Sequence, residues 1–151
     1  MASFTGHAEH SIDSKGRVPV PARMRRALRP EAQETFMATR GIERCIYLYP
    51  MDHWTTVIEP QLDSLNQFQP EARHFVRMLG MWAEEVTLDG QGRIALSKEL
   101  ADFAGLQPTG KAQISGAFRR IEVWDPDTFR AYLNEQQDQY EDLAQRVMGG
   151  L

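Results

Sequence analysis

A motif that occurs twice, 76 residues apart, constrains the fold of this chain more than any other feature. The two copies are Ile12-Asp13-Ser14-Lys15-Gly16-Arg17 and Leu88-Asp89-Gly90-Gln91-Gly92-Arg93. Each has an apolar residue, an Asp, two variable positions, a Gly and an Arg in the same order, and an apolar residue follows. Because Asp, Gly and Arg are all shifted by 76 positions, the sequence indicates internal duplication, which must be settled before any other pattern is interpreted.

Short helices are predicted directly after each copy, over residues 21–28 and 97–104. Proline suits the first helical position, where its missing N–H costs nothing, and Pro21 stands there in the first half. Serine suits an N-cap, and Ser97 stands there in the second half. The two halves therefore continue to match beyond the motif.

A pair of strands joined by a turn is predicted next in each half. The segments are 35–39 with 45–50 in the first half and 112–116 with 121–126 in the second. Pro50 and Pro126 are again 76 residues apart, and each is expected to end a strand and open a helix. Each repeat is therefore predicted to contain a strand, a Gly turn, a strand, a short helix, a hairpin and a longer helix.

Four segments follow from this pattern. We expect repeat 1 over 4–50, bridging helices over 51–82, repeat 2 over 83–126, and a C-terminal helix and tail over 127–151. Among the bridging helices, one over 52–65 is expected to be interrupted by Pro60, and a second begins at Pro70. A single long polar helix is predicted from Pro126 to about Met148. Halves of about 75 residues bury little surface alone, so they are expected to pair intimately.

The charge of the chain is distributed unevenly. The net charge is −4, but between residues 15 and 29 the sequence has six bases and no acid: Lys15, Arg17, Arg23, Arg25, Arg26 and Arg29. Removing these six positive charges leaves −10 on the rest of the chain. In the second half, Arg93 and Lys98 are offset by Asp89, Glu99 and Asp102. This predicts a localised anion-binding face, contributed mainly by the first half.

The motif itself permits two interpretations. Gly16 and Gly92 fit a turn position that needs positive φ. Asp13 and Arg17 flank the turn, so one interpretation is a structural salt bridge with an Asx turn. In the other, Lys15 and an exposed Arg17 reach toward phosphates or a guanine edge. Both can hold, with Asp positioning the turn and the bases reaching outward. Similarly, the arginines of residues 23–26 form either a solvated helix face or part of the binding face.

Other classes of protein are disfavoured. The sequence has no phosphate-binding Gly-rich loop, nucleophile elbow or cluster of Cys and His with metal-site spacing, so no enzyme activity, cofactor or metal is predicted. The single cysteine, Cys45, points to a reducing compartment. Residues 1–10 do not fit a signal peptide, and no apolar run approaches the ~18 residues of a membrane span, so a cytoplasmic protein is expected.

These motifs resemble those of the MraZ family. The matching residues are Asp13 to Arg23, Tyr47-Leu48-Tyr49-Pro50, Pro70-Glu71-Ala72-Arg73 and Leu88 to Ile94. The resemblance implies an α+β, mostly β fold. This would be a tandem, pseudo-symmetric barrel of swapped hairpins related to AbrB-like regulators, with helices joining and following the repeats.

The resemblance also implies a function. It implies a homo-oligomer, commonly an octameric ring, that binds direct repeats in promoter double-stranded DNA. The regulated genes would be the cell-division and cell-wall cluster that encodes the protein, which implies association with the nucleoid. The implied DNA contacts are Lys15, Gly16, Arg17, Arg23 and Arg93, and Asp13, Asp89 and Gly92 shape the motifs. Gln91 replaces the lysine-type position, so Arg17 is expected to matter more for DNA than Arg93. An alternative is a structural ring that acts mainly through protein–protein contacts.

Overall fold

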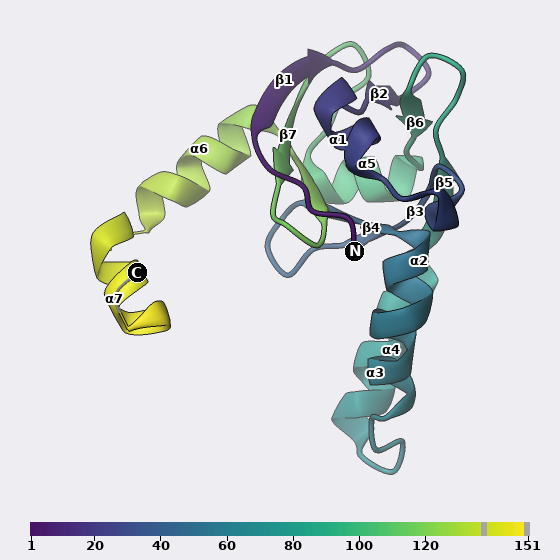
Figure 1. The fold of residues 1–151 in the computed structure, drawn as a ribbon, viewed down its shortest axis with the longest axis vertical. Helices are drawn as coiled ribbons and strands as arrows, with labels where there is room; N and C mark the ends of the chain where they lie inside the picture. The colour runs from purple at the N-terminus through teal and green to yellow at the C-terminus, as the bar shows by residue number, and fades with distance from the viewer. Residues whose placement is uncertain (137–138, 150–151) are drawn as a thin grey trace.

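The computed structural model describes residues 1–136 and 139–149. Repeat 1 contains β1 (His7–Ser11), β2 (Arg17–Pro19), α1 (Ala22–Ala27), a 3-10 turn (Pro30–Ala32), β3 (Thr35–Arg40) and β4 (Ile46–Pro50). Repeat 2 contains β5 (Glu84–Thr87), β6 (Arg93–Ala95), α5 (Lys98–Ala104), β7 (Lys111–Gly116) and β8 (Ile121–Trp124). The predicted α+β class and the duplicated order of elements are confirmed (Figure 1).

The two repeats exchange strands. The six-stranded sheet has the order β1-β7-β8-β4-β3-β5, so β1 of repeat 1 pairs with β7 of repeat 2, and β5 of repeat 2 pairs with β3 of repeat 1. The pairs Ala8–Ile114 and Ala38–Glu84 have equivalent registers, because a shift of 76 converts one into the other. The predicted swapping of hairpins is therefore confirmed.

A second, two-stranded ladder joins β2 to β6, with Val18 opposite Ile94. These residues are themselves equivalent, so a pseudo-twofold axis passes between them. Pro19 lies in this short ladder, as expected for a strand that cannot donate every ladder hydrogen bond. The correspondence shifts by one residue in β8, because the β7–β8 turn is shorter, and Tyr49 matches Trp124 there.

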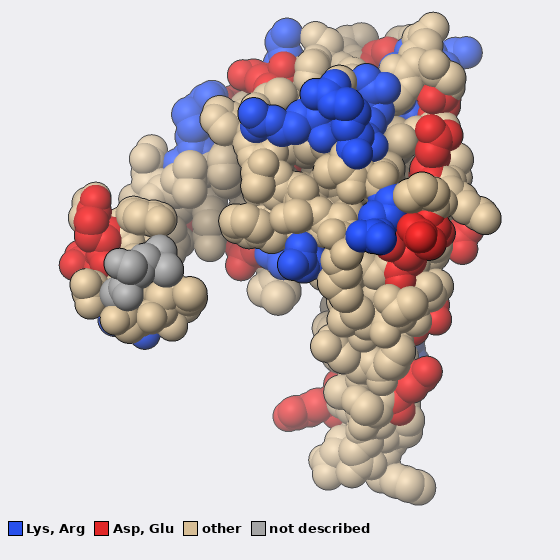
Figure 2. Space-filling model, viewed as in Figure 1, with Lys and Arg blue, Asp and Glu red and all other residues tan. Residues whose placement is uncertain are grey.

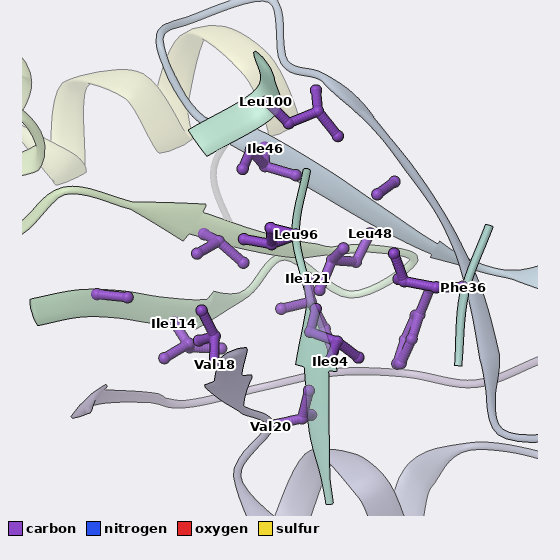
Figure 3. Packing of buried hydrophobic residues seen from close by; sticks show 14 of the residues in the cluster. Val18, Val20, Phe36, Ile46, Leu48, Ile94, Leu96, Leu100, Ile114 and Ile121 are labelled. Atoms are coloured by element: carbon purple, nitrogen blue, oxygen red, sulfur yellow. The ribbon is translucent and has the colours of Figure 1, made fainter. Parts of the chain in front are cut away.

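The main hydrophobic core lies between the ladder and the larger sheet, and a smaller cluster of Cys45, Tyr47 and Trp124 is buried apart from it. Figure 3 shows Val18 and Ile94 of the ladder facing Phe36 and Leu48 of the sheet, with Leu100 of α5 at its edge. All five side chains are almost completely buried. Both repeats supply this core, so neither half has one of its own, and the predicted intimate pairing is confirmed.

The bridging helices project from the body as a helical hairpin (Figure 1). The first arm runs through α2 (Met51–His53), a π-helical segment (Trp54–Ile58) and α3 (Glu59–Asp63), and α4 (Pro70–Trp82) returns beside it. The predicted interruption at Pro60 is wrong, since the helix continues to Asp63. Pro60 lacks an N–H, and the wider π turn directly before it absorbs the lost hydrogen bond. Within the described ranges, no helix has the length and apolarity that crossing a membrane requires.

The predicted single C-terminal helix is also wrong. The structure has α6 (Pro126–Glu135) and α7 (Tyr140–Met148), and the backbone of Gln136 and Gln139 is extended between them. Gln137 and Asp138 of the predicted helix, and Gly150 and Leu151 of the predicted tail, lie outside the described residues. No apolar side chain stands between Leu133 and Tyr140 to hold this stretch against the core, and a short helix is marginal without such packing.

Candidate nucleic-acid interface

The two motifs form the same turn. Asp13 Oδ1 accepts hydrogen bonds from the backbone N–H groups of Lys15 and Arg17, at 2.9 and 2.8 Å. The backbone N–H of Gly16 donates to the Asp13 carbonyl oxygen at 3.0 Å, and Gly16 has φ +78°. The Asx turn and the positive φ predicted for this glycine are therefore confirmed. A carboxylate at this position fixes the turn, because it satisfies two backbone donors at once.

The second motif reproduces this geometry. Asp89 Oδ1 accepts from the backbone N–H groups of Gln91 and Arg93, at 2.8 and 3.0 Å, and Gly92 has φ +74°. Because the ladder between β2 and β6 is only three residues long, the two turns at its ends remain close together.

An ion-pair network joins the turns. Arg17 Nε lies 2.6 Å from Asp13 Oδ2, and Arg93 Nε lies 3.0 Å from Asp89 Oδ2. Arg93 also donates through Nη1 to Asp13 Oδ2 at 3.3 Å. The Arg17 side chain is only 34% exposed, so the expectation of an exposed loop arginine is wrong. Its guanidinium turns back onto Asp13, because this carboxylate has an oxygen left after accepting the two backbone bonds.

Hydrogen bonding also controls the charge of the two carboxylates. The backbone N–H of Arg17 is the largest of several influences that lower the pKa of Asp13 from 3.8 to about 2. The backbone N–H of Arg93 is the main cause of the lowered pKa of Asp89. Both groups are therefore ionised at neutral pH and act only as acceptors. They offset the charges of Arg17 and Arg93, which leaves the exposed Lys15 as the uncompensated cation of the first turn.

The exposed surface of α1 is basic. Met24 anchors this helix in the core and is 1% exposed, so Arg23, Arg25 and Arg26 lie on the outer side. Figure 2 shows Lys and Arg side chains gathered over α1. The equivalent positions of α5, 76 residues later, are Glu99, Ala101 and Asp102. The predicted basic face therefore lies on one half of a pseudo-symmetric body.

Arg25 has a structural contact that the sequence did not reveal. Its guanidinium packs over Gly92, where a Cβ atom would lie only 2.7 Å from Cζ, and its Nε donates to the Val20 carbonyl oxygen at 3.0 Å. Gly92 is thus needed both for its positive φ and for its lack of a side chain. The residue equivalent to Arg25 is Ala101, so nothing comparable covers Gly16. The sequence offered two signals for this contact: Arg25 has no acid near it in sequence, and the second motif contains Gly92.

The predicted site residues are not all brought together. Asp13, Arg17, Asp89 and Arg93 form one network, and Lys15 stands on the turn that this network holds. Arg23 lies instead against Gly6, and no described contact joins it to the network. Among the described residues, no three His, Cys, Asp or Glu side chains gather as metal ligands would.

Comparison with known proteins places these features in context. The family model described as "MraZ protein, putative antitoxin-like" matches residues 3–78 and again residues 79–149. The chain is 38% identical to the transcriptional regulator MraZ of Natranaerobius thermophilus over 145 residues, which is 96% of each chain. It is 40% identical to the transcriptional regulator MraZ of Desulfitobacterium hafniense over the same length and the same share of each chain.

Proposed function

The chain belongs to the MraZ family, and on that premise we propose that it is a sequence-specific DNA-binding transcriptional regulator. It binds tandem direct repeats in promoter DNA as a ring-shaped homo-oligomer. The regulated promoter is that of the cell-division and cell-wall gene cluster in which the protein is encoded, so the protein works in the cytoplasm at the nucleoid. The names of its relatives support the regulatory role.

The observation that carries this proposal is the uncompensated basic surface of repeat 1. Three bases are exposed on this surface: Lys15 on the turn, and Arg23 and Arg26 on α1. None of the three has an acidic partner in the part of the chain that the structure describes. Lysine and arginine bind backbone phosphates and release counterions from DNA, and an arginine can also make a bidentate contact with guanine. The body of the protein is acidic, so DNA is attracted to this surface and repelled elsewhere.

The two motifs have different roles in this proposal. The turn of residues 13–17 reads the DNA, and Gly16 allows the backbone to approach it closely. The Asp13 carboxylate holds this turn before binding, so little conformational entropy is lost when DNA binds. Arg93 of the second motif stabilises the turn of residues 13–17. It donates its remaining N–H groups to the phosphate backbone of the DNA. Gln91 stands where the first motif has Lys15, so the second turn adds less charge.

Assembly accounts for the recognition of tandem sites. One copy presents a small basic surface, and such a surface gives only weak binding at physiological salt. Several linked copies convert the later contacts into intramolecular ones and raise the overall affinity by about 10²–10⁴-fold. A ring would hold these surfaces at regular spacing, which suits repeats that all point in the same direction.

The test is binding to the duplex upstream of the protein's own gene, measured across a salt series. Lys15→Ala is compared with Gln91→Ala, its equivalent in repeat 2, and Arg26→Ala with Asp102→Ala. We expect each repeat 1 variant to weaken binding and to reduce the slope of log K against log salt by about 0.9. The repeat 2 variants should bind at least as well as the unmodified protein. Absence of binding at low salt, or equal losses in both repeats, would overturn the proposal.

A second candidate function is supported by apolar surface. Ile42 on the β3–β4 turn is 90% exposed, and Phe75 on the helical hairpin is 53% exposed. Exposed apolar groups that lie near one another mark protein contacts. A ring acting mainly through protein partners would retain its activity when Lys15 and Arg26 are replaced.

A further inference from the structure

An open apolar groove lies between the β3–β4 turn and the helical hairpin. Its volume is about 470 Å³, and its walls come from β4, the π segment, α3 and α4 through Tyr49, Trp54, Ile58, Leu62, Phe75 and Leu79. Ile42 stands at its edge. Among the described residues that line it, Arg40 is the only one with a charged side chain. A groove of this character fits an amphipathic helix laid lengthwise into it.

The C-terminal arm, which we define as α6 and α7, has the complementary surface. Tyr140, Leu143 and Val147 lie at positions i, i+3 and i+7 of α7, so they share one face. They are 73%, 42% and 75% exposed. A helix of nine residues is marginal in water unless such a face is covered. The arm therefore has an apolar stripe that is largely exposed to solvent.

Repeat 1 shows how such an arm is covered. There the helix that follows the hairpin strands, α2 to α3, is accompanied by α4, which returns beside it (Figure 1). The equivalent helix of repeat 2 is α6, and it projects from the body without such a companion (Figure 1). Leu133 on α6 is accordingly 51% exposed. The helix that follows the hairpin strands thus has a neighbouring helix in repeat 1 and none in the described part of repeat 2.

The topology directs the arm away from the groove of its own chain. Strands β4 and β8 are antiparallel neighbours, with Tyr47 opposite Glu122, so α2 and α6 leave from opposite ends of this strand pair. Figure 1 shows α6 and α7 lying apart from the helical hairpin. Because the groove and the arm lie apart in one copy, the arm is placed to meet the groove of another copy.

Charge favours the same pairing. The two helices of the arm have four acids, Asp127, Glu135, Glu141 and Asp142, and two bases, Arg130 and Arg146, so they are acidic overall. Arg40 lines the groove with its guanidinium over the Trp82 and Phe103 rings, and Arg44 is exposed on the adjoining turn and donates to the Phe103 carbonyl oxygen. Opposite charges at the edge of an apolar contact steer association and fix its register.

We propose that the arm of one copy docks through the α7 stripe into the groove of a second copy. This proposal rests on the proposed function and specifies the contact that joins the copies of its oligomer. The two surfaces differ, so the contact is heterologous, and repeating it around an axis closes a ring. Each copy then donates one arm and receives another.

The test measures the mass of the full chain without DNA, by sedimentation velocity and light scattering. Ile42→Glu alters the groove and Leu143→Glu alters the arm. Phe68→Glu is the control, because Phe68 is 92% exposed at the tip of the hairpin and does not line the groove. We expect the unmodified protein and the control to form assemblies larger than dimers, and each interface variant alone to be monomeric.

Mixing the two interface variants gives the decisive result. The groove variant still has a normal arm and the arm variant still has a normal groove, so an equimolar mixture should form heterodimers and stop there. Absence of heterodimers, or retention of the full mass by either variant alone, would overturn the proposal. Ile42→Ser and Val147→Ser replace the first pair if a charged variant fails to fold in a thermal melt.

A DNA measurement separates this proposal from the proposed function. The interface variants retain Lys15 and α1, so their affinity for a single repeat at low salt should equal that of the unmodified protein. Their affinity for tandem repeats should fall by about 10²-fold or more, because multivalency is lost. Loss of DNA binding by an intact assembly would contradict the proposed function alone. An unchanged assembly in both interface variants would contradict the docking alone.

Discussion

Arg93 of the second motif donates to Asp13 of the first, with 3.3 Å between Nη1 and Oδ2, while its Nε lies 3.0 Å from its own Asp89. Arg17 is bonded to Asp13, and no described contact joins it to Asp89. Arg93 therefore links the second turn to the first, and Arg17 makes no equivalent described contact in return. The second motif supports the geometry of the first, even though it contributes less charge to the surface.

Replacement of Arg93 should therefore affect stability more than replacement of Arg17. Arg93→Ala leaves two carboxylates without their shared donor, so we expect the melting temperature to fall by a few degrees. Arg17→Ala removes one ion pair and should lower it less, and Lys15→Ala should leave it unchanged. Differential scanning calorimetry provides the measurement. If Arg17→Ala lowers the melting temperature more than Arg93→Ala does, the contact of Arg93 with both turns does not contribute to stability as we infer.

The pH dependence of stability should reflect Asp13. Its pKa in the folded protein is about 2, below the ordinary 3.8. Between these values the unfolded chain binds a proton that the folded chain does not, so acid favours unfolding. The stabilisation is complete above about pH 4 and is lost as the pH falls through about 2. Melting temperatures of Asp13→Asn should fall less steeply over that interval. Parallel curves for the two proteins would show that Asp13 contributes no such stabilisation.

Gly92 and Arg25 should be energetically coupled. Gly16→Ala and Gly92→Ala both place an alanine at positive φ, which costs about 1–2 kcal/mol. Gly92→Ala should cost more, because the new methyl group also displaces the Arg25 guanidinium and its hydrogen bond to Val20. In an Arg25→Ala background this excess should disappear. A double-mutant cycle by urea unfolding should yield a coupling of at least about 0.5 kcal/mol, and zero coupling would contradict the contact.

The asymmetry of charge can be tested by gain of function. Glu99→Arg places a base where α5 corresponds to Arg23 of α1, on the same pseudo-symmetric body. We expect tighter binding to duplex DNA at low salt and a steeper salt dependence, by up to about 0.9 in the slope. Glu71→Arg makes the same change of charge on the exposed surface of the helical hairpin and serves as the control. Equal gains from both variants would mean that net charge, and not the face, determines binding.

The motif turns could be predicted from sequence because everything that shapes them lies within five residues. The Asp side chain bonds to backbone N–H groups two and four residues later, and a glycine supplies the positive φ. The Ser97 cap, whose Oγ accepts from the Leu100 N–H, is equally local and is also confirmed. Such features depend on spacing alone, which the sequence displays directly.

Features that depend on distant residues could not be predicted in this way. The partial burial of Arg17 results from how the turns meet at the ladder, and Arg25 reaches a glycine 67 positions away in the sequence. The break after α6 reflects the absence of a packing partner, whereas helical propensity continues through the polar run. The groove arises where the β3–β4 turn faces a helical hairpin, and no periodicity encodes that relationship.

The exchange of strands between the repeats has a further consequence for the proposed function. Two identical separate chains arranged in this way would carry the same side chains on both sides of their axis, and would be restricted to palindromes. Joining the halves in one polypeptide allows each to vary independently, as Lys15 and Gln91 or Arg26 and Asp102 have done. The basic surface on which the proposed function rests therefore has a polarity, and a duplex bound there in one direction meets different side chains from a duplex bound in the other.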